Sequence, residues 1–249
     1  MVLRRVSRSG KKIEKGYSFL DVGCGLGNHC FALLDYSPKE VYGFDISNET
    51  IELLKSFSDE IQFRKIDICE DDITEFKDRF DMAFSCDVYE HVNVPQVMLN
   101  NLYYILKKGG GVSVTFPNFD DHGHNQFYDI NDFRKMIEKA GFRDIQIDIV
   151  RDRSFIYKVF TFIYMRLQDL SDIIFGIKRN PNRMPDSDEF HEMYAYKKIN
   201  KIKNRKVLVK SINFVYNILK KVGRLSGVYS TEENNSDVKN KRIVFFAVK

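Results

Sequence analysis

Short apolar runs alternate with amphipathic stretches through the first 150 residues of the chain. Brief apolar runs bounded by turn residues are typical of buried strands, and apolar positions spaced three and four apart are typical of helices. The pattern predicts strands over residues 17–22, 41–45, 61–66, 80–85, 112–116, 144–150 and 243–248. It predicts helices over residues 28–36, 48–57, 95–106 and 131–140, with Gly109, Gly110 and Gly111 ending the third. This alternation favours an α/β fold built on a doubly wound, mostly parallel sheet.

The first predicted strand breaks into three alternating glycines, Gly23, Gly25 and Gly27. Glycines between a strand and a helix let the backbone approach a ligand that side chains would exclude. The dinucleotide fingerprint is spaced G-x-G-x-x-G, whereas the spacing here is G-x-G-x-G. Asp21 precedes the first glycine, where it would repel a pyrophosphate and attract an ammonium group. The turn therefore predicts a nucleotide-like ligand that carries a positive amino group.

Acidic residues follow the next strands. Asp45 ends the second strand about twenty residues beyond the glycines, where a carboxylate can hold two ribose hydroxyls. Asp67 follows the third strand and is placed to accept from an exocyclic amine such as that of adenine. Cys86 and Asp87 follow the fourth. Because the carboxyl ends of parallel strands share one edge, we expect these residues to meet in one crevice.

This series resembles the class I S-adenosylmethionine-dependent methyltransferases, nearest in motif to the ubiquinone-pathway O-methyltransferases. Residues 21–27 are similar to their first motif, and residues 80–84 with 87–92 to their fourth. Residues 106–110 are similar to the turn before their fifth strand. The resemblance implies a Rossmann-like sheet of seven strands whose last strand is antiparallel and lies between the fifth and sixth. It also implies S-adenosylmethionine as cofactor.

The expected cofactor-binding residues line the glycine turn and the ends of strands one to four. They are Asp21, Gly23, Cys24, Gly25, Gly27, Asp45, Ile46, Asp67, Ile68 and Cys86. Asp45 is expected on the ribose and Asp67 on the adenine side.

Three polar residues after the fourth strand are candidates for catalysis. Asp87, Glu90 and His91 are spaced i, i+3, i+4, which places them on one side of a turn. His91 would act as a base whose tautomer a carboxylate sets. A divalent metal is the second interpretation, implied by the resemblance, although Asp87 is shorter than the glutamate usual there. The third is that Glu90 and His91 only stabilise the loop.

A second polar segment, residues 120–127, follows the fifth strand. His122 or His124 could assist proton removal, and His124 is the one we carry forward as a catalytic candidate. The alternative is a solvated loop with incidental histidines.

The charge is divided unevenly along the chain. Residues 17–150 hold 12 Lys and Arg against 24 Asp and Glu, whereas residues 151–241 hold 19 against 10. The pattern predicts a basic segment at 1–16, a cofactor-binding core at 17–150 and 242–249, and a helical insertion at 151–241. Helices are expected there at 155–177, 189–202 and 207–222. The insertion is either a lid over the substrate or a packing or homodimer surface, and its charge favours anionic surfaces such as lipid headgroups.

The donor is thus better defined than the acceptor. We expect a small-molecule or lipid-like acceptor methylated at oxygen. A glycan is an alternative acceptor. Nucleic acid is less favoured, because the Asn/Asp-Pro-Pro-Tyr/Phe motif typical of amino methylation of nucleobases does not follow strand four. A third alternative is a module that binds S-adenosylmethionine without catalysing a reaction.

The four cysteines lack metal-like spacing and favour reduced thiols. With no apolar leader or membrane-length run, we expect a cytoplasmic protein, or one peripheral to a membrane.

Overall fold

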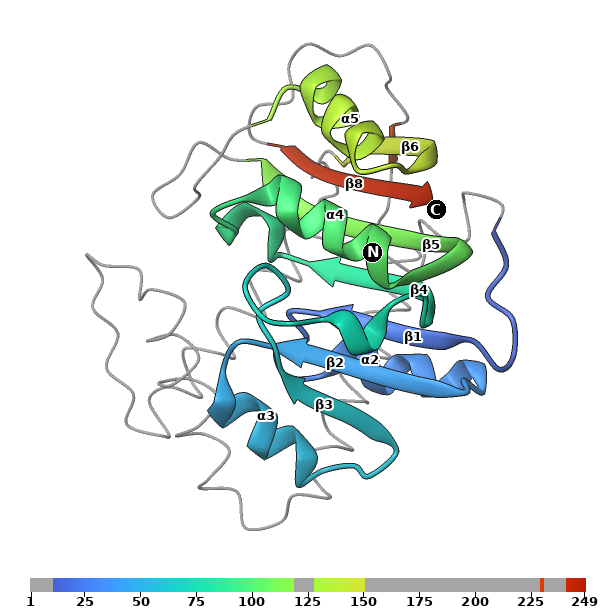
Figure 1. Cartoon of the computed structure of the whole chain (residues 1–249), viewed down its shortest axis with the longest axis vertical. Helices are drawn as coiled ribbons and strands as arrows, with labels where there is room; N and C mark the ends of the chain where they lie inside the picture. The colour runs from blue at the N-terminus through green and yellow to red at the C-terminus, as the bar shows by residue number, and fades with distance from the viewer. Residues whose placement is uncertain (1–10, 119–127, 151–228, 231–240) are drawn as a thin grey trace, which may run out of the picture.

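The computed structural model describes residues 11–118, 128–150, 229–230 and 241–249, and these form one twisted sheet with helices on its faces (Figure 1). The strands are β1 (Ser18–Val22), β2 (Glu40–Asp45), β3 (Ile61–Lys65), β4 (Phe80–Cys86), β5 (Leu106–Asn118), β6 (Arg143–Val150), β7 (Tyr229–Ser230) and β8 (Lys241–Val248). The helices are α2 (Asn28–Leu33), α3 (Asn48–Lys55), α4 (Pro95–Ile105) and α5 (Ile130–Lys139). Short 3₁₀ turns are η1 (Leu34–Tyr36), η2 (Thr74–Phe76) and η3 (Tyr89–His91).

The strand order is β3-β2-β1-β4-β5-β8-β6-β7. Strands β1 to β5 run parallel to one another, and β8 runs antiparallel to both β5 and β6. This confirms the predicted sheet of seven strands with an antiparallel last strand. The structure adds the two-residue strand β7, which pairs with the end of β6 through Val150 and Tyr229.

The residues of each strand alternate between two cores. In β1, Phe19 packs with α2 and α3 on one face of the sheet, and Leu20 packs with α4 and α5 on the other. Both side chains are fully buried, as expected for a central parallel strand covered on two faces. Figure 1 shows α4 and α5 together on the second face, over the part of the sheet that contains β5, β8 and β6.

Two differences from the predicted elements stand out, at the start of β5 and at β7. Strand β5 begins at Leu106, directly after α4, so the three glycines lie within the strand and do not precede it. Its pairing with β4 shifts between Phe80 and Met82, because β5 advances from Leu106 to Gly111 over that interval. Strand β7 also falls inside the range expected to be a helical insertion. The helices expected at 155–177, 189–202 and 207–222 lie outside the described residues.

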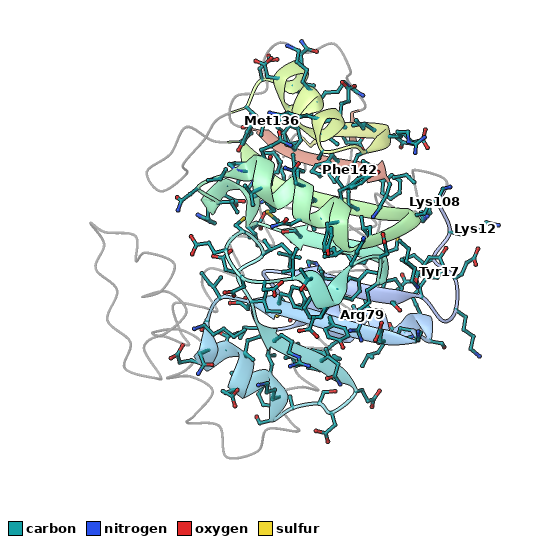
Figure 2. The ribbon with its side chains drawn as sticks, in the orientation of Figure 1. Lys12, Tyr17, Arg79, Lys108, Met136 and Phe142 are labelled. Carbon is teal, nitrogen blue, oxygen red and sulfur yellow. The ribbon has the colours of Figure 1, made fainter. Side chains whose placement is uncertain are left out.

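Charged side chains tie together the amino ends of the strands (Figure 2). Arg79 donates to both carboxylate oxygens of Glu40, at 3.2 and 2.9 Å, and to the hydroxyl of Tyr42 at 2.7 Å. Asp81 Oδ2 accepts from the amide of Ser18 at 2.8 Å and from Lys107 Nζ at 2.7 Å. The opposite, carboxyl edge is therefore the one left for ligands.

Among the described residues, no helix is long and apolar enough to cross a membrane.

Candidate active site

The glycine turn after β1 has a backbone conformation that favours glycine at all three positions. Gly23, Gly25 and Gly27 have φ values of 70°, 48° and 73°, which L side chains rarely adopt. A Cβ atom at Gly23 would lie 2.1 Å from Cγ2 of Val88 in the loop after β4. Gly23 thus allows the turn to press against the segment that leads into Glu90 and His91.

Asp45 lies at the end of β2, buried beside this turn. Its Oδ2 accepts from the amide of Gly25 at 2.8 Å, and its Oδ1 accepts from the amide of Ser47 at 3.0 Å. Ser47 in turn caps α3 by accepting from the amide of Thr50. One carboxylate therefore links the glycine turn, β2 and α3, at the place expected for a ribose-binding acid.

Asp21 is buried in β1, one residue before the strand ends. Its Oδ2 lies 3.7 Å from Cys30 Sγ and 3.7 Å from His29 Nδ1. Within the described part of the chain, its Oδ1 has no hydrogen-bond partner. A buried carboxylate oxygen without a partner is costly, and an ammonium group would remove that cost. The geometry therefore fits the expected attraction to a methionine amino group.

Cys24 has its side chain in the core. Its thiol and that of Cys30 each lie 3.0 Å from the point that a Cβ of Gly43 would occupy, so Gly43 makes room for both. Burial, together with the hydrogen bond to Cys24, raises the pKa of Cys30 well above its usual value. The backbone amides of Gly23 and Cys24 both donate to the carbonyl of Phe44, at 2.8 and 2.9 Å. The side chain of Cys24 thus packs in the core, and its backbone amide donates to Phe44. Neither group is directed to a cofactor, in contrast to what the sequence predicted for Cys24.

The adenine side of the expected site is more open. Asp67 is half-buried, and its Oδ1 accepts from the amide of Cys69 at 2.8 Å. Ile68 is buried in the main core, which leaves only its backbone for a ligand. Ile46, directly after Asp45, is exposed, as are Leu26 in the glycine turn and Val94 before α4. Each follows the carboxyl end of a strand, so exposed apolar side chains gather at the ligand edge.

The three catalytic candidates differ in burial and contacts. Asp87 has φ 58° and precedes η3, and its carboxylate pairs with Arg242 of β8. Glu90 is 2% exposed, and its Oε1 lies 3.9 Å from Nε2 of His91, which is 50% exposed. The 3₁₀ turn begins at Tyr89, so Glu90 and His91 belong to it and Asp87 precedes it.

Glu90 is held in place by the turn around it. Tyr89 is fully buried and packs its ring against Phe116 and Phe133, at centroid distances of 4.9 and 5.5 Å. The pKa of Glu90 is raised to about 7, mainly by burial and also by the nearby Asp87 carboxylate, while a backbone hydrogen bond and the charge of Arg242 lower it. Among the described residues, Oε2 of Glu90 has no hydrogen-bond partner. A carboxyl group that titrates near neutral pH beside an imidazole is suited to proton transfer.

The geometry gives no support to the metal interpretation. Over the described ranges, no three His, Cys, Asp or Glu side chains come together as metal ligands. Asp87 is engaged by a guanidinium, and Glu90 is directed into a buried position. Cys86, at the end of β4, is half-buried, and burial raises the pKa of its thiol to about 12.

A buried amide closes the base of the loop after β5. Asn118 donates through Nδ2 to the carbonyl of Tyr128 at 2.9 Å and accepts from the amide of Tyr128 at 3.0 Å. His122 and His124 belong to residues 119–127, which lie outside the described residues, so their candidate role stays a prediction.

Replacing Asn118 with leucine is expected to destabilise the protein by about 2 kcal/mol or more, since both backbone groups of Tyr128 lose a buried partner. Thermal unfolding measures the loss. Asn131→Leu, on the exposed start of α5, is the matched control and is expected to change stability little. Equal unfolding temperatures for the two variants would contradict this role of Asn118.

Two residues of the site were not among the sequence candidates. His29 contacts Asp21 from the start of α2, and Arg242 reaches Asp87 from the start of β8. The signal for Arg242 was available: the first residues of an antiparallel strand lie at the edge where parallel strands end.

A doubly wound sheet with this order, a G-x-G-x-G turn after β1 and acids at the ends of β1 and β2 defines a class I S-adenosylmethionine-dependent methyltransferase. The comparison with protein families agrees. The chain belongs to the methyltransferase domain family, whose profile matches residues 13–239.

Curated relatives differ in the acceptor they name. Phosphoethanolamine N-methyltransferase 1 of Triticum aestivum is 26% identical over 158 residues, covering 57% of this chain and 31% of the relative. A tRNA U34 carboxymethyltransferase of Campylobacter curvus is 28% identical over 152 residues, covering 53% and 50%. A ubiquinone biosynthesis O-methyltransferase of Coxiella burnetii is 35% identical over 98 residues, covering 39% and 42%. The chain spans about a third to a half of the length of these relatives.

Solved structures support the fold. Phosphoethanolamine N-methyltransferase 2 of Haemonchus contortus, in complex with S-adenosyl-L-methionine, has a TM-score of 0.54 at 17% identity. The match covers 99% of this chain and 51% of that chain.

Proposed function

We propose that this protein transfers the methyl group of S-adenosylmethionine to an oxygen atom of a small-molecule or lipid-like acceptor. The observation that carries the proposal is the pair of Glu90 and His91, which places a half-exposed imidazole beside a buried carboxyl at the ligand edge. An alcohol or phenol must lose a proton when it is methylated, so it needs such a base. The similarity to a ubiquinone biosynthesis O-methyltransferase supports the same class of acceptor.

The cofactor would be held by groups at the ends of the first three strands. Asp45 would accept from the ribose hydroxyls, Asp21 from the methionine ammonium group, and Asp67 from the adenine amine, with Ile46 against the ring. When bound, S-adenosylmethionine supplies an electrophilic methyl group on its sulfonium. The protein contributes orientation, because it brings the acceptor oxygen into line with that methyl group.

Proton removal would fall to His91. Its imidazole accepts the proton of the acceptor hydroxyl, and the Glu90 carboxylate 3.9 Å away stabilises the imidazolium that forms. Because burial raises the pKa of Glu90 to about 7, this carboxylate becomes charged as the pH rises through neutrality. Activity should therefore increase from pH 6 to pH 8 in step with that ionisation.

Replacing Glu90 with glutamine is expected to separate activity from stability. Below about pH 4.5 the carboxyl is protonated in the folded and unfolded chains alike. Between that pH and about 7 only the unfolded chain ionises, so the wild-type protein loses about 2 to 3 kcal/mol as the pH rises, and the glutamine variant does not. Glu90→Gln should thus match the wild type near pH 4 and be the more stable of the two at pH 8. It should nevertheless be at least about tenfold less active.

Urea unfolding at several pH values and methyl transfer at the same values measure both effects. Glu138→Gln, on α5, is the control for loss of one carboxylate. A Glu90→Gln variant that keeps full activity at pH 8 would remove Glu90 from the mechanism.

Calorimetry with S-adenosylhomocysteine tests the cofactor half of the proposal, and the absence of binding would refute it. The acceptor is tested by incubating the protein and methyl-labelled S-adenosylmethionine with separated aqueous, lipid and RNA fractions of a cell extract. Label is expected in an O-methylated product of the aqueous or lipid fraction, identified by mass spectrometry. Label only on nitrogen would refute oxygen as the acceptor atom.

Nucleic acid is the second candidate acceptor, favoured by the excess of basic residues in 151–241 and by the similarity to a tRNA-modifying enzyme. Label in the RNA fraction, with binding that weakens steeply as salt is added, would support it over the first. In either case we propose that the insertion covers the acceptor.

A further inference from the structure

Arg242 brings a positive charge to the acceptor side of the site. Because β8 is antiparallel to β5, its first residues lie beside the last residues of β5, and Arg242 pairs with Pro117. Its guanidinium therefore reaches the edge where Asp87 follows β4, although 155 positions of sequence separate the two residues.

The guanidinium is only partly used. Its Nη1 donates to Oδ1 of Asp87, and the side chain of Arg242 is 27% exposed. Within the part of the chain that the structure describes, Nε and Nη2 make no other hydrogen bond or ion pair. A guanidinium has five N–H donors in a planar fork that matches carboxylate and phosphate geometry. Donors thus remain for a second anion next to Asp87.

The backbone conformation of Asp87 is unusual, and its carboxylate binds the guanidinium of Arg242. Its φ of 58° costs roughly 1 kcal/mol for a residue other than glycine. The conformation is kept by the Asp87 amide, which donates to the carbonyl of Thr115 at 2.9 Å, and by the ion pair with Arg242. Asp87 thus has a strained backbone, lies next to the turn that carries Glu90 and His91, and binds the guanidinium of Arg242. Strain of this kind is typical of functional sites.

The charge also lies close to the proposed base. Asp87 is three residues before Glu90, and the charge of Arg242 acts on Glu90 directly. Arg242 is therefore close enough for its charge to act on Glu90, whose carboxylate lies 3.9 Å from the imidazole of His91. Among the described residues, the ionisable side chains that act on Arg242 are those of Asp87, Cys86 and Glu90.

We propose that Arg242 binds an anionic group of the methyl acceptor, a carboxylate or a phosphate, and that Asp87 positions the guanidinium. This rests on the proposed function, because it assumes that the acceptor lies at this edge. It narrows the substrate class to small molecules that carry both a hydroxyl and an anionic group.

Anion binding to the protein saturated with S-adenosylhomocysteine tests the proposal, with inorganic phosphate and acetate as probes in separate titrations. Wild-type protein should bind at least one of them in the millimolar range, and the tighter of the two shows which anion the acceptor carries. Arg242→Gln should weaken that binding about tenfold or more, with S-adenosylhomocysteine affinity unchanged. Arg242→Lys keeps the charge and should give an intermediate value.

Asp87→Asn separates ligand binding from a purely structural ion pair. Asparagine tolerates the left-handed conformation, so the loop is retained while the competing carboxylate charge is removed. Anion binding should become severalfold tighter in this variant, whereas a structural pair would give only lower stability. Arg79→Gln, which removes the arginine paired with Glu40 at the opposite edge, is the matched control and should leave anion binding unchanged.

Wild-type protein that binds the cofactor product and neither anion would overturn the inference, as would unchanged anion binding in Arg242→Gln. Failure to bind S-adenosylhomocysteine would instead count against the proposed function itself.

Discussion

Replacing Gly23 with alanine is expected to cost about 4 kcal/mol of stability and to abolish cofactor binding. Alanine must adopt a φ near 70°, and its Cβ would lie 2.1 Å from Cγ2 of Val88. The clash cannot be relieved locally, because Val88 leads directly into η3, where buried Tyr89 fixes the backbone. Moving Val88 would therefore also displace Glu90 and His91. Thermal unfolding and calorimetry with S-adenosylhomocysteine measure the two losses.

Gly25→Ala and Gly16→Ala are the matched controls. Both glycines have positive φ, at 48° and 82°, but a Cβ at either meets no atom within 4 Å. Each variant should lose only about 1 kcal/mol, from backbone strain alone. If Gly23→Ala unfolds at the same temperature as Gly25→Ala, the contact with Val88 is not what requires glycine at position 23.

Replacing Asp45 with asparagine is expected to weaken S-adenosylhomocysteine binding about 100-fold. Hydrogen bonds to a charged group contribute about 1.5 kcal/mol or more each, and the proposed role gives Asp45 two ribose hydroxyls. In the wild-type protein the amides of Gly25 and Ser47 each donate to one oxygen of the Asp45 carboxylate. Asparagine keeps only one of these oxygens, so its NH₂ group would face the other backbone amide and that hydrogen bond would be lost. The glycine turn should therefore be less well held as well.

Calorimetry at a temperature where the variant is fully folded separates the two effects. Asp59→Asn, which removes a carboxylate from an exposed position after α3, should bind as the wild type does. An Asp45→Asn variant that binds within about threefold of wild type would exclude Asp45 from the ribose site.

The parts of the fold that could be predicted are those whose signal is local. Apolar runs predicted the seven strands to within one or two residues, except at β5. The turn of Gly23, Gly25 and Gly27 lies between β1 and α2, as expected. The start of β5 was missed because its extended backbone depends on pairing with β4, which three glycines in a row do not reveal. Strand β7 was missed for a similar reason, since two residues carry no periodicity and form a strand only through β6.

The sequence predicted where the candidate site lies in the fold better than it predicted which side chains contact one another there. Asp21 and Asp45 lie at the expected strand ends, because parallel topology fixes where those ends meet. The contacts depend on packing between segments that are far apart in the chain. This packing buries Glu90, leaves His91 half exposed and pairs Asp87 with Arg242. No spacing rule within residues 87–91 contains that information.

The pairing of Val150 with Tyr229 has a consequence for how such a protein can diversify. Val150 at the end of β6 and Tyr229 at the start of β7 are paired residues, so the positions on either side of 151–228 are adjacent in the sheet. Closing a flexible loop costs free energy that grows only with the logarithm of its length, about 0.6 kcal/mol for each doubling. Segments of different length and composition can therefore be exchanged at this point without shifting the register of β6 or β8. Selectivity for new acceptors can then arise while the half of the sheet that carries the glycine turn stays the same.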